Sequence, residues 1–204
     1  MIAIIDYGLG NVLAFENVYK RLNIPVTVAK STDDLANATK LILPGVGSFD
    51  HAIQQLEQSG MRQAIEQLVL KQEMPVLGIC VGMQMLAASS DEGVLPGLGW
   101  VAGKVKKFDE ATMPPGTCLP HMGWNDVKPL AGSGLFKGME LDARFYFLHS
   151  YYFECHQQAD VLAVTDYGGS FCCAVRHDNV YGVQFHPEKS HHFGSQLLKN
   201  FAEI

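Results

Sequence analysis

The sequence predicts an α/β fold: a central, mostly parallel β-sheet flanked by helices, with additional antiparallel strands in the C-terminal half. In the first half, short apolar runs alternate with amphipathic stretches, which is typical of parallel strands covered by helices. In the second half, short apolar runs follow one another with turn residues between them, which is typical of antiparallel strands. With 48% hydrophobic residues the chain can bury a substantial core, and we expect one domain over residues 1–204.

The first half is expected to consist of strands alternating with helices. The strands are expected at the short apolar runs Ile2–Ile5, Val26–Ala29, Leu41–Leu43 and Val76–Ile79. Between these runs, apolar residues recur at the 3.6-residue spacing of a helix that packs one face on a sheet. These faces consist of Val12, Phe15, Val18, Tyr19 and Leu22, then of Phe49, Ile53 and Leu56, and then of Ala64, Ile65 and Leu68.

From Trp100 onward the chain is expected to form largely antiparallel strands or hairpins. These strands are expected at Trp100–Phe108, Gly123–Val127, Phe145–Phe153, Val161–Thr165, Cys172–Arg176 and Tyr181–Phe185. A last helix over roughly Gly194–Glu203 is expected to turn its apolar residues inward. The stretch Asp109–Gly116, with its paired prolines, is predicted to be a surface loop.

Composition excludes several classes of function. The chain has 15 Lys and Arg against 21 Asp and Glu, a net charge of −6, and no basic run that would follow a nucleic acid or an anionic membrane. No apolar run approaches the roughly 20 residues that a membrane span needs, and the first residues lack a basic leader. We therefore expect a cytoplasmic protein without nucleic-acid or membrane partners.

The cysteines do not form a recognisable framework. Five cysteines at irregular spacing fit neither a set of disulfides nor a zinc site, since no Cys-x-x-Cys pair occurs. We expect reduced thiols, no metal site and no cofactor. Four of them read as small buried hydrophobes or inert surface thiols: Cys118, Cys155, Cys172 and Cys173.

Cys80 differs from the other cysteines because of its neighbours. It lies where an apolar strand runs into a helix-forming segment, with Gly78 and Gly82 on either side. A nucleophile at such a turn is held in a strained conformation, and flanking glycines avoid clashes with neighbouring strands. The start of the helix would favour a thiolate and the oxyanion formed on attack. The alternative is a buried cysteine between two glycines that merely allow tight packing.

A candidate base lies near the C-terminus, at the end of an expected strand. Pro187 biases His186 towards extended geometry, so that His186 and Glu188 can project to the same side. A carboxylate beside an imidazole fixes its tautomer and stabilises the imidazolium that forms when it accepts a thiol proton. The alternative is a solvated histidine and a surface glutamate. The other histidines singled out, His51, His156, His177, His191 and His192, are read mostly as surface residues.

Two further elements could complete a site. Pro44–Gly47 follows an apolar strand and precedes a helix, so its glycines can direct backbone N–H groups into the space beside Cys80. Gln84 and Glu92 could recognise the amide and amino ends of a small polar substrate. For Gln84 and Glu92 the alternative is an ordinary position on a helix surface.

Together these motifs resemble the class I glutamine amidotransferases. The Gly-Ile-Cys-x-Gly turn, the Pro-Gly-Val-Gly segment and the Phe-His-Pro-Glu end occur in the expected order. More narrowly, longer segments are similar to the glutaminase subunits of imidazole glycerol phosphate synthases, and the match spans almost the whole chain. These segments are Asp6–Asn11, Pro120–Asn125, Phe145–Tyr152 and Gly182–Ser190. Several long motifs in order are far more specific than any one of them.

The resemblance implies a flavodoxin-like fold and a separate partner. In this family the glutaminase docks on a (β/α)8 cyclase subunit, and ammonia passes through that barrel to a ribulosyl nucleotide in histidine biosynthesis. The implied products are imidazole glycerol phosphate and aminoimidazole carboxamide ribotide. The expected assembly is a heterodimer, and the expected substrate is L-glutamine.

The resemblance also assigns roles to individual residues. It implies Cys80 as nucleophile, His186 as general base and acid, and Glu188 as the group that orients His186. The other implied roles are an oxyanion hole from Val81 and Gly47, substrate binding by Gln84, Glu92, Ser150 and Tyr151, and a partner interface at Asn11, Trp124 and Lys189. A γ-glutamyl thioester on the cysteine, then hydrolysed by water, is the implied intermediate.

Three alternatives remain from the sequence. The chain could serve another synthase, such as the anthranilate, aminodeoxychorismate or pyridoxal phosphate systems, although Pro120–Asn125 and Phe145–Tyr152 argue against this. It could be a catalytically silent module that regulates a cyclase, or a cysteine hydrolase that acts on peptides without a partner.

Overall fold

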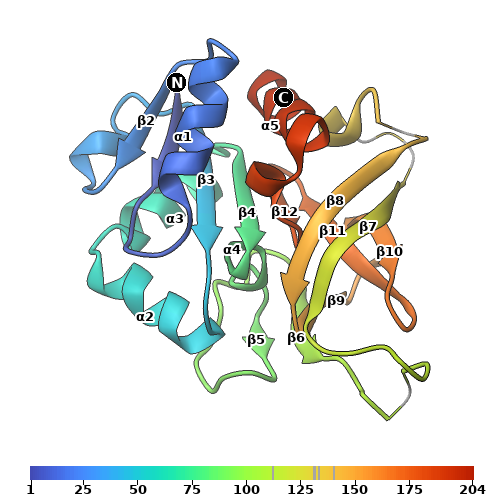
Figure 1. Cartoon of the computed structure of the whole chain (residues 1–204). Helices are drawn as coiled ribbons and strands as arrows, with labels where there is room; N and C mark the ends of the chain where they lie inside the picture. The colour runs from blue at the N-terminus through green and yellow to red at the C-terminus, as the bar shows by residue number, and fades with distance from the viewer. Residues whose placement is uncertain (112, 131, 133, 140) are drawn as a thin grey trace.

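The computed structural model of the chain places a mixed sheet at its centre (Figure 1). It describes residues 1–111, 113–130, 132, 134–139 and 141–204. The strands pair in the order β2-β1-β3-β4-β12-β11-β10-β7-β8, and β9 branches from β11 to pair with β6. The predicted α/β class, with its antiparallel C-terminal extension, is confirmed.

The parallel part of the sheet carries the first half of the chain and one later strand. Its strands are β1 (Ile2–Ile5), β2 (Val26–Ala29), β3 (Lys40–Gly45), β4 (Val76–Cys80) and β12 (Val180–Val183). Neighbours in the order β2-β1-β3-β4-β12 are all parallel, which is the order of a flavodoxin-like sheet. The apolar runs predicted these strands to within two residues, because strands buried on both faces are continuously apolar.

Helices cover this parallel part. They are α1 (Val12–Arg21), α2 (Phe49–Gln58), α3 (Arg62–Lys71), the short α4 (Val81–Gln84) and α5 (His191–Glu203). The described residues also form the 3-10 helices η1 (Asp33–Leu35), η2 (Gly134–Phe136), η3 (Gln158–Asp160) and η4 (Pro187–Lys189), of which η2 contacts α5 and η3 contacts β11. The N- and C-terminal helices α1 and α5 contact each other (Figure 1). Among the described residues, no helix is long and apolar enough to cross a membrane.

The helices differ from the prediction in two respects, the inward face of α3 and the start of α5. In α3, Ile65 and Val69 are fully buried while Ala64 and Leu68 are only partly so, which rotates the inward face slightly from the prediction. Helix α5 begins at His191, three residues before the predicted start. A Cβ on Gly194 would lie 1.7 Å from the Pro187 carbonyl oxygen, so glycine there lets α5 pack directly against η4.

The second half forms the antiparallel part. Its strands are β5 (Ser89–Ser90), β6 (Gly103–Lys107), β7 (His121–Pro129), β8 (Ala143–His149), β9 (Tyr151–Cys155), β10 (Val161–Asp166) and β11 (Ser170–His177). The prediction of one strand over Phe145–Phe153 is wrong, because the chain changes partners at Ser150: β8 pairs with β7, and β9 pairs with β6 and β11. The expected loop Asp109–Gly116 lies between β6 and β7, although residue 112 is outside the described residues.

Candidate active site

Cys80 is the last residue of β4 and is immediately followed by α4. Its backbone φ of 56° lies in a region that residues other than glycine rarely adopt, so the backbone at Cys80 is strained. The turn fits only because glycines surround it. A Cβ on Gly78 would lie 2.6 Å from the Gly82 carbonyl oxygen, and one on Gly82 would lie 1.9 Å from the Leu43 carbonyl oxygen. The strand-to-helix turn predicted at this cysteine is confirmed.

His186 and Glu188 form a buried pair next to Cys80. The Nδ1 atom of His186 lies 2.9 Å from Oε1 of Glu188, and both side chains are at most 5% exposed. The backbone N–H of His186 donates to the Tyr146 carbonyl at 2.8 Å, which ties it to β8. One residue earlier, the ring of Phe185 stacks on Phe145 with centroids 3.9 Å apart. His186 is therefore held by a backbone hydrogen bond to β8, by aromatic packing next to it and by a carboxylate.

The surroundings of His186 favour its charged form. Burial by itself lowers the pKa of the imidazole, but the hydrogen bonds to Cys80 and Glu188 and the negative charges of those groups outweigh burial and raise the pKa to about 10. At neutral pH the imidazole therefore carries a proton that it can give to a leaving group. A positive imidazolium beside a cysteine also stabilises a thiolate.

The segment Pro44–Gly47 runs beside Cys80. Gly45 is in register with Cys80 across β3 and β4, and a Cβ on Gly45 would lie 2.5 Å from the backbone nitrogen of Gly82. Gly47 has a φ of 88°, so the chain turns there in a way that favours glycine. This close approach places Gly47 and Val81 on the wall of the same cavity as Cys80.

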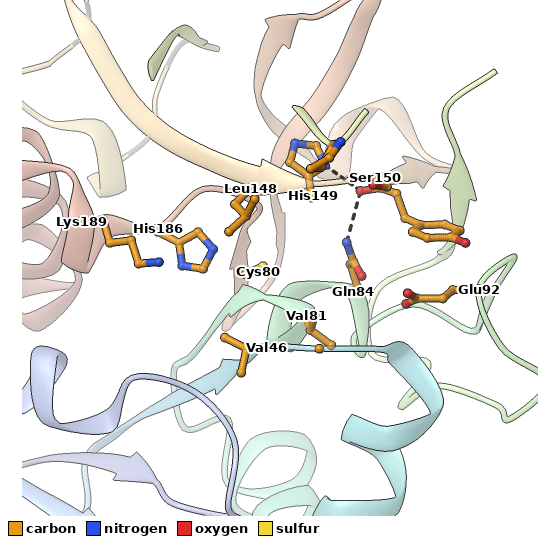
Figure 2. Close-up of a pocket in the computed structure, with 13 residues that line it drawn as sticks. Val46, Cys80, Val81, Gln84, Glu92, Leu148, His149, Ser150, His186 and Lys189 are labelled. Atoms are coloured by element: carbon orange, nitrogen blue, oxygen red, sulfur yellow. Dashed lines mark hydrogen bonds between the residues drawn. The ribbon is translucent and has the colours of Figure 1, made fainter. Parts of the chain in front are cut away.

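The cavity has a volume of about 310 Å³, and Figure 2 shows the residues that line it. This is the lower end of the size range of small-molecule sites, suited to an amino acid. It brings together the predicted catalytic residues Cys80 and His186 with Gly47, Val81, Gln84, Glu92, Ser150, Tyr151 and Lys189. Glu188 lies behind His186, while Asn11 and Trp124 lie outside the cavity lining.

The two candidate substrate-binding side chains are held firmly. Gln84 is 3% exposed, so the alternative of a helix-surface residue is wrong for it. Its amide nitrogen donates to the Tyr151 carbonyl at 3.2 Å and to Oε1 of Gln184 at 3.0 Å. Glu92 accepts a hydrogen bond from the backbone N–H of Phe49 at 2.8 Å, at the start of α2. This hydrogen bond fixes the Glu92 carboxylate at the N-terminal end of α2, on the wall of the cavity.

Several residues at the site were not singled out by the sequence. Tyr7 is buried and its hydroxyl donates to the Pro44 carbonyl at 2.7 Å; burial and the negative charge of Cys80 raise its pKa above the usual range, so the hydroxyl stays a donor. Gln184 donates to Sγ of Cys80 at 3.9 Å. His121 and His149 are buried, and His149 lines the cavity.

The remaining histidines and cysteines lie away from the cavity. His51, His156, His191 and His192 are exposed, whereas His177 is partly buried and pairs with Asp160 at 3.0 Å. Cys118 is exposed, and Cys155 and Cys172 are neighbouring free thiols with Sγ atoms 3.6 Å apart; Cys173 is buried. Among the described residues, no group of three or more His, Cys, Asp or Glu residues could hold a metal.

The three residues expected at a partner interface are all at the surface. Asn11 is exposed just before α1, and the exposed Lys189 places its Nζ 5.8 Å from the ring centre of Tyr146. Trp124 on β7 is 39% exposed and stacks on the ring of His191, with centroids 5.3 Å apart.

Solved structures share this fold. A structure of a glutamine amidotransferase matches with a TM-score of 0.74 at 18% identity, covering 100% of this chain and 99% of that chain. A structure of PurLQS from Thermotoga maritima matches with a TM-score of 0.74 at 16% identity, covering 99% of this chain and 97% of that one. At these identities the likeness concerns the fold alone.

Sequence relatives are much more similar. The subunit HisH of imidazole glycerol phosphate synthase from Bdellovibrio bacteriovorus is 66% identical over 204 residues, and the same subunit from Leptospira interrogans is 52% identical, each over the full length of both chains. The family model for class-I glutamine amidotransferases matches residues 3–204. The chain therefore belongs to the class-I glutamine amidotransferase family and, within it, to the HisH subunits of imidazole glycerol phosphate synthase.

Proposed function

We propose that this chain hydrolyses glutamine to glutamate and ammonia, and that it supplies the ammonia to a partner cyclase subunit in histidine biosynthesis. The observation that carries the proposal is the buried His186, which pairs with Glu188 and lines the same cavity of amino-acid size as Cys80. This arrangement has the roles of a nucleophile, a base and an orienting carboxylate. No cofactor is needed for this chemistry.

The reaction proceeds in two halves. The Cys80 thiolate attacks the carboxamide carbon of glutamine, and backbone N–H groups of Val81 and Gly47 stabilise the oxyanion. His186, protonated at neutral pH, gives its proton to the departing nitrogen, so ammonia leaves and a γ-glutamyl thioester remains. Water then attacks the thioester and gives a proton to His186, and collapse of the adduct releases glutamate and restores the Cys80 thiolate beside the protonated His186. The net reaction consumes one glutamine and one water.

Residues of the opposite cavity wall recognise the amino-acid end of glutamine. Glu92 presents a negative charge to the α-ammonium group, and Gln84 with the backbone of Ser150 and Tyr151 supplies polar contacts. The support is that all four line the cavity with Cys80, and that Gln84 and Glu92 are held by hydrogen bonds before any ligand binds. Such preorganisation reduces the entropy lost on binding.

The partner docks over the mouth of this cavity. On the outer face of β7 and β8, Met122 is paired with Leu148 and Trp124 with Tyr146. Met122, Trp124 and Leu148 are 64%, 39% and 37% exposed, and Leu148 also lines the cavity. An apolar face that reaches a cavity mouth suits a partner that must receive ammonia without losing it to water. This partner is a (β/α)8 cyclase forming a cytoplasmic heterodimer, with Asn11 and Lys189 at the rim.

The test is glutamate release from glutamine by the chain alone, and then with a histidine-pathway cyclase together with its ribulosyl nucleotide. We expect low activity alone and strong stimulation by the pair. The Cys80→Ala variant in the complex should lose at least about 10⁴-fold in kcat, since triad members act as a unit. The matched control is Cys118→Ala, at an exposed thiol that is not among the residues lining the cavity.

The outcomes separate the alternatives. Undiminished hydrolysis by Cys80→Ala would overturn the chemistry. Wild-type glutaminase activity that does not respond to the cyclase would keep the chemistry but overturn the proposed coupling to the cyclase. Failure of a glutamine-analogue affinity reagent to label Cys80 in the complex would favour a silent regulatory module.

A further inference from the structure

A chain of hydrogen bonds runs from the β7–β8 ribbon to the cavity. Asn125 Nδ2 lies 3.2 Å from His121 Nε2, and His121 Nδ1 lies 3.0 Å from His149 Nε2. His149 Nδ1 lies 2.7 Å from the carbonyl oxygen of Tyr151, which also accepts from Gln84 Nε2 at 3.2 Å (Figure 2). Two buried imidazoles thus connect the ribbon to the backbone that lines the cavity.

The series of hydrogen bonds continues from the cavity wall to Cys80. The second hydrogen bond of the Gln84 amide nitrogen goes to Oε1 of Gln184 at 3.0 Å. Because its oxygen is taken in this way, Gln184 turns its own amide nitrogen to Sγ of Cys80, 3.9 Å away. A donor in this position stabilises negative charge on the sulfur.

Each hydrogen bond in the chain has only one direction. A carbonyl oxygen can only accept, so Nδ1 of His149 must carry the hydrogen that binds the Tyr151 oxygen. In a neutral imidazole the other nitrogen is then an acceptor, so Nδ1 of His121 must donate to Nε2 of His149. By the same step, Nε2 of His121 accepts from the amide of Asn125. Both rings are therefore neutral Nδ1–H tautomers, and the polarity runs from Asn125 towards the cavity.

The surroundings keep both rings neutral and fixed. Burial lowers the pKa of His121 to about 4. Burial, opposed by the hydrogen bond to the Tyr151 carbonyl, lowers the pKa of His149 to about 3. His121 lies between two rings, with centroids 4.6 Å from Phe147 and 3.9 Å from Tyr167, at interplanar angles of 20° and 19°. A ring held on both faces cannot turn to offer its other nitrogen.

We propose that His121 and His149 are positioning residues for glutamine hydrolysis, acting as a one-directional relay that fixes the Tyr151 carbonyl and, through Gln84 and Gln184, the donor on the Cys80 sulfur. The inference rests on the proposed function of this cavity. Neither ring touches the reacting atoms, and neither transfers a proton. Their effect is to keep the substrate-binding backbone and the amide of Gln184 in one orientation.

A matched pair of variants tests the direction of the relay. In His149→Asn the amide nitrogen can occupy the place of Nδ1 and still donate to Tyr151, whereas in His149→Gln the polar group occupies the place of Nε2 and that donation is lost. In the complex with the cyclase, we expect His149→Asn to stay within about 3-fold of wild type in kcat/KM. We expect His149→Gln to fall by about 10-fold or more, with KM for glutamine raised. His156→Asn and His156→Gln, at an exposed histidine, are the controls and should be unchanged.

A second site and a spectroscopic signature guard against variants that fail to fold. Asn125→Asp replaces the first donor by an acceptor of the same shape at a partly exposed position, and kcat/KM should fall by about 3-fold or more. Nitrogen-15 NMR of histidine-labelled wild-type chain should show a protonated Nδ1 and a bare Nε2 for His121 and His149.

Equal losses in His149→Asn and His149→Gln, or Nε2–H tautomers in the NMR spectrum, would overturn the relay while leaving the triad intact. Absence of glutaminase activity in the wild-type complex would instead overturn the proposed function, and the positioning role with it. The NMR result does not depend on activity, so the two failures are distinguishable.

Discussion

The two halves of the molecule hold the site in different ways. The parallel half positions Cys80 and Pro44–Gly47 by close backbone packing, in which a single added methyl group on Gly82 would strike the Leu43 carbonyl. His186 follows β12 of the parallel part, but it and the cavity wall are held by polar contacts and stacked rings, several of them from the antiparallel half. The position of Cys80 therefore depends on close packing, whereas His186 and the cavity wall depend on charge and on hydrogen-bond direction.

The largest expected effect tests the charge beside His186. Glu188→Gln keeps the shape of the side chain but removes the charge that supports the His186 imidazolium. We expect kcat for glutamine in the complex to fall by roughly 10³-fold or more. Thermal denaturation should show a folded variant, and Glu203→Gln, at an exposed glutamate of α5, should leave kcat unchanged. A kcat within about 10-fold of wild type would show that the charge is not needed.

The next effect tests volume in the parallel half. In Gly82→Ala the new Cβ would lie 1.9 Å from the Leu43 carbonyl oxygen, so β3 or α4 must move. Overpacking of this kind is expected to lower the free energy of unfolding by about 3 kcal/mol, measured by urea denaturation. Gly134→Ala is the control, because the nearest atom to its Cβ would be 3.9 Å away. Equal stability of the two variants would remove the basis of the comparison.

The apolar face of the ribbon is expected to matter for association rather than for folding. Trp124→Ala removes a large aromatic side chain from the proposed interface, and we expect affinity for the cyclase to fall by about 2 kcal/mol, roughly 30-fold. Isothermal titration calorimetry with the cyclase measures this change. Leu70→Ala, at a half-exposed residue of α3, is the control and should bind normally. An unchanged affinity for Trp124→Ala would place the interface elsewhere.

Acid should weaken the antiparallel half through its buried neutral histidines. The pKa of His149 is lowered to about 3 in the folded chain, so between its ordinary value of 6.5 and about 3 the unfolded state binds more protons. Stability from this group is therefore present above pH 6.5 and is lost as the pH falls.

Replacement of His149 separates its contribution to the pH dependence of stability from those of two other histidines. The pKa of His121 is also lowered, whereas the pKa of His186 is raised and acts in the opposite direction. Between about pH 7 and pH 5.5 the unfolding free energy of both proteins is expected to fall, and the fall should be about 1 kcal/mol smaller in His149→Asn than in wild type. Urea denaturation at each pH measures this difference. Parallel pH profiles for the two proteins would show that this imidazole is not kept neutral.

The last effect concerns the strained backbone at Cys80. Cys80 has a φ of 56°, which glycine adopts without cost. We expect Cys80→Gly to be more stable than Cys80→Ala by about 1 kcal/mol, measured by thermal and urea denaturation. Equal stabilities would mean that the turn relaxes when the thiol is removed.

Local patterns were enough to predict the nucleophile turn and the parallel strands. Gly78, Cys80 and Gly82 define a backbone requirement within five residues of sequence, and the parallel strands are continuous apolar runs. The break at Ser150 could not be predicted in this way, because it arises where the chain exchanges β7 for β6 and β11 as partners. Such an exchange depends on residues that are distant in sequence.

The burial of His149 could have been predicted from the alternation of residues along its strand, although histidine is a polar residue. Phe145, Phe147 and His149 alternate along β8, so the face that buries the two phenylalanines also buries the histidine. The pairing of His149 with His121 follows from the register of β7 and β8, which the sequence alone does not contain. Gln184 likewise follows a buried strand, and only the fold brings it to Gln84 and Cys80.

The exposed face formed by Met122, Trp124 and Leu148 has a consequence for the cell that makes the protein. An uncovered apolar surface at a sheet ribbon promotes self-association and aggregation. If the cyclase covers this face, chains made in excess of the cyclase are the ones that lose solubility. Balanced synthesis of the two subunits then protects the solubility of the chain as well as its catalytic coupling.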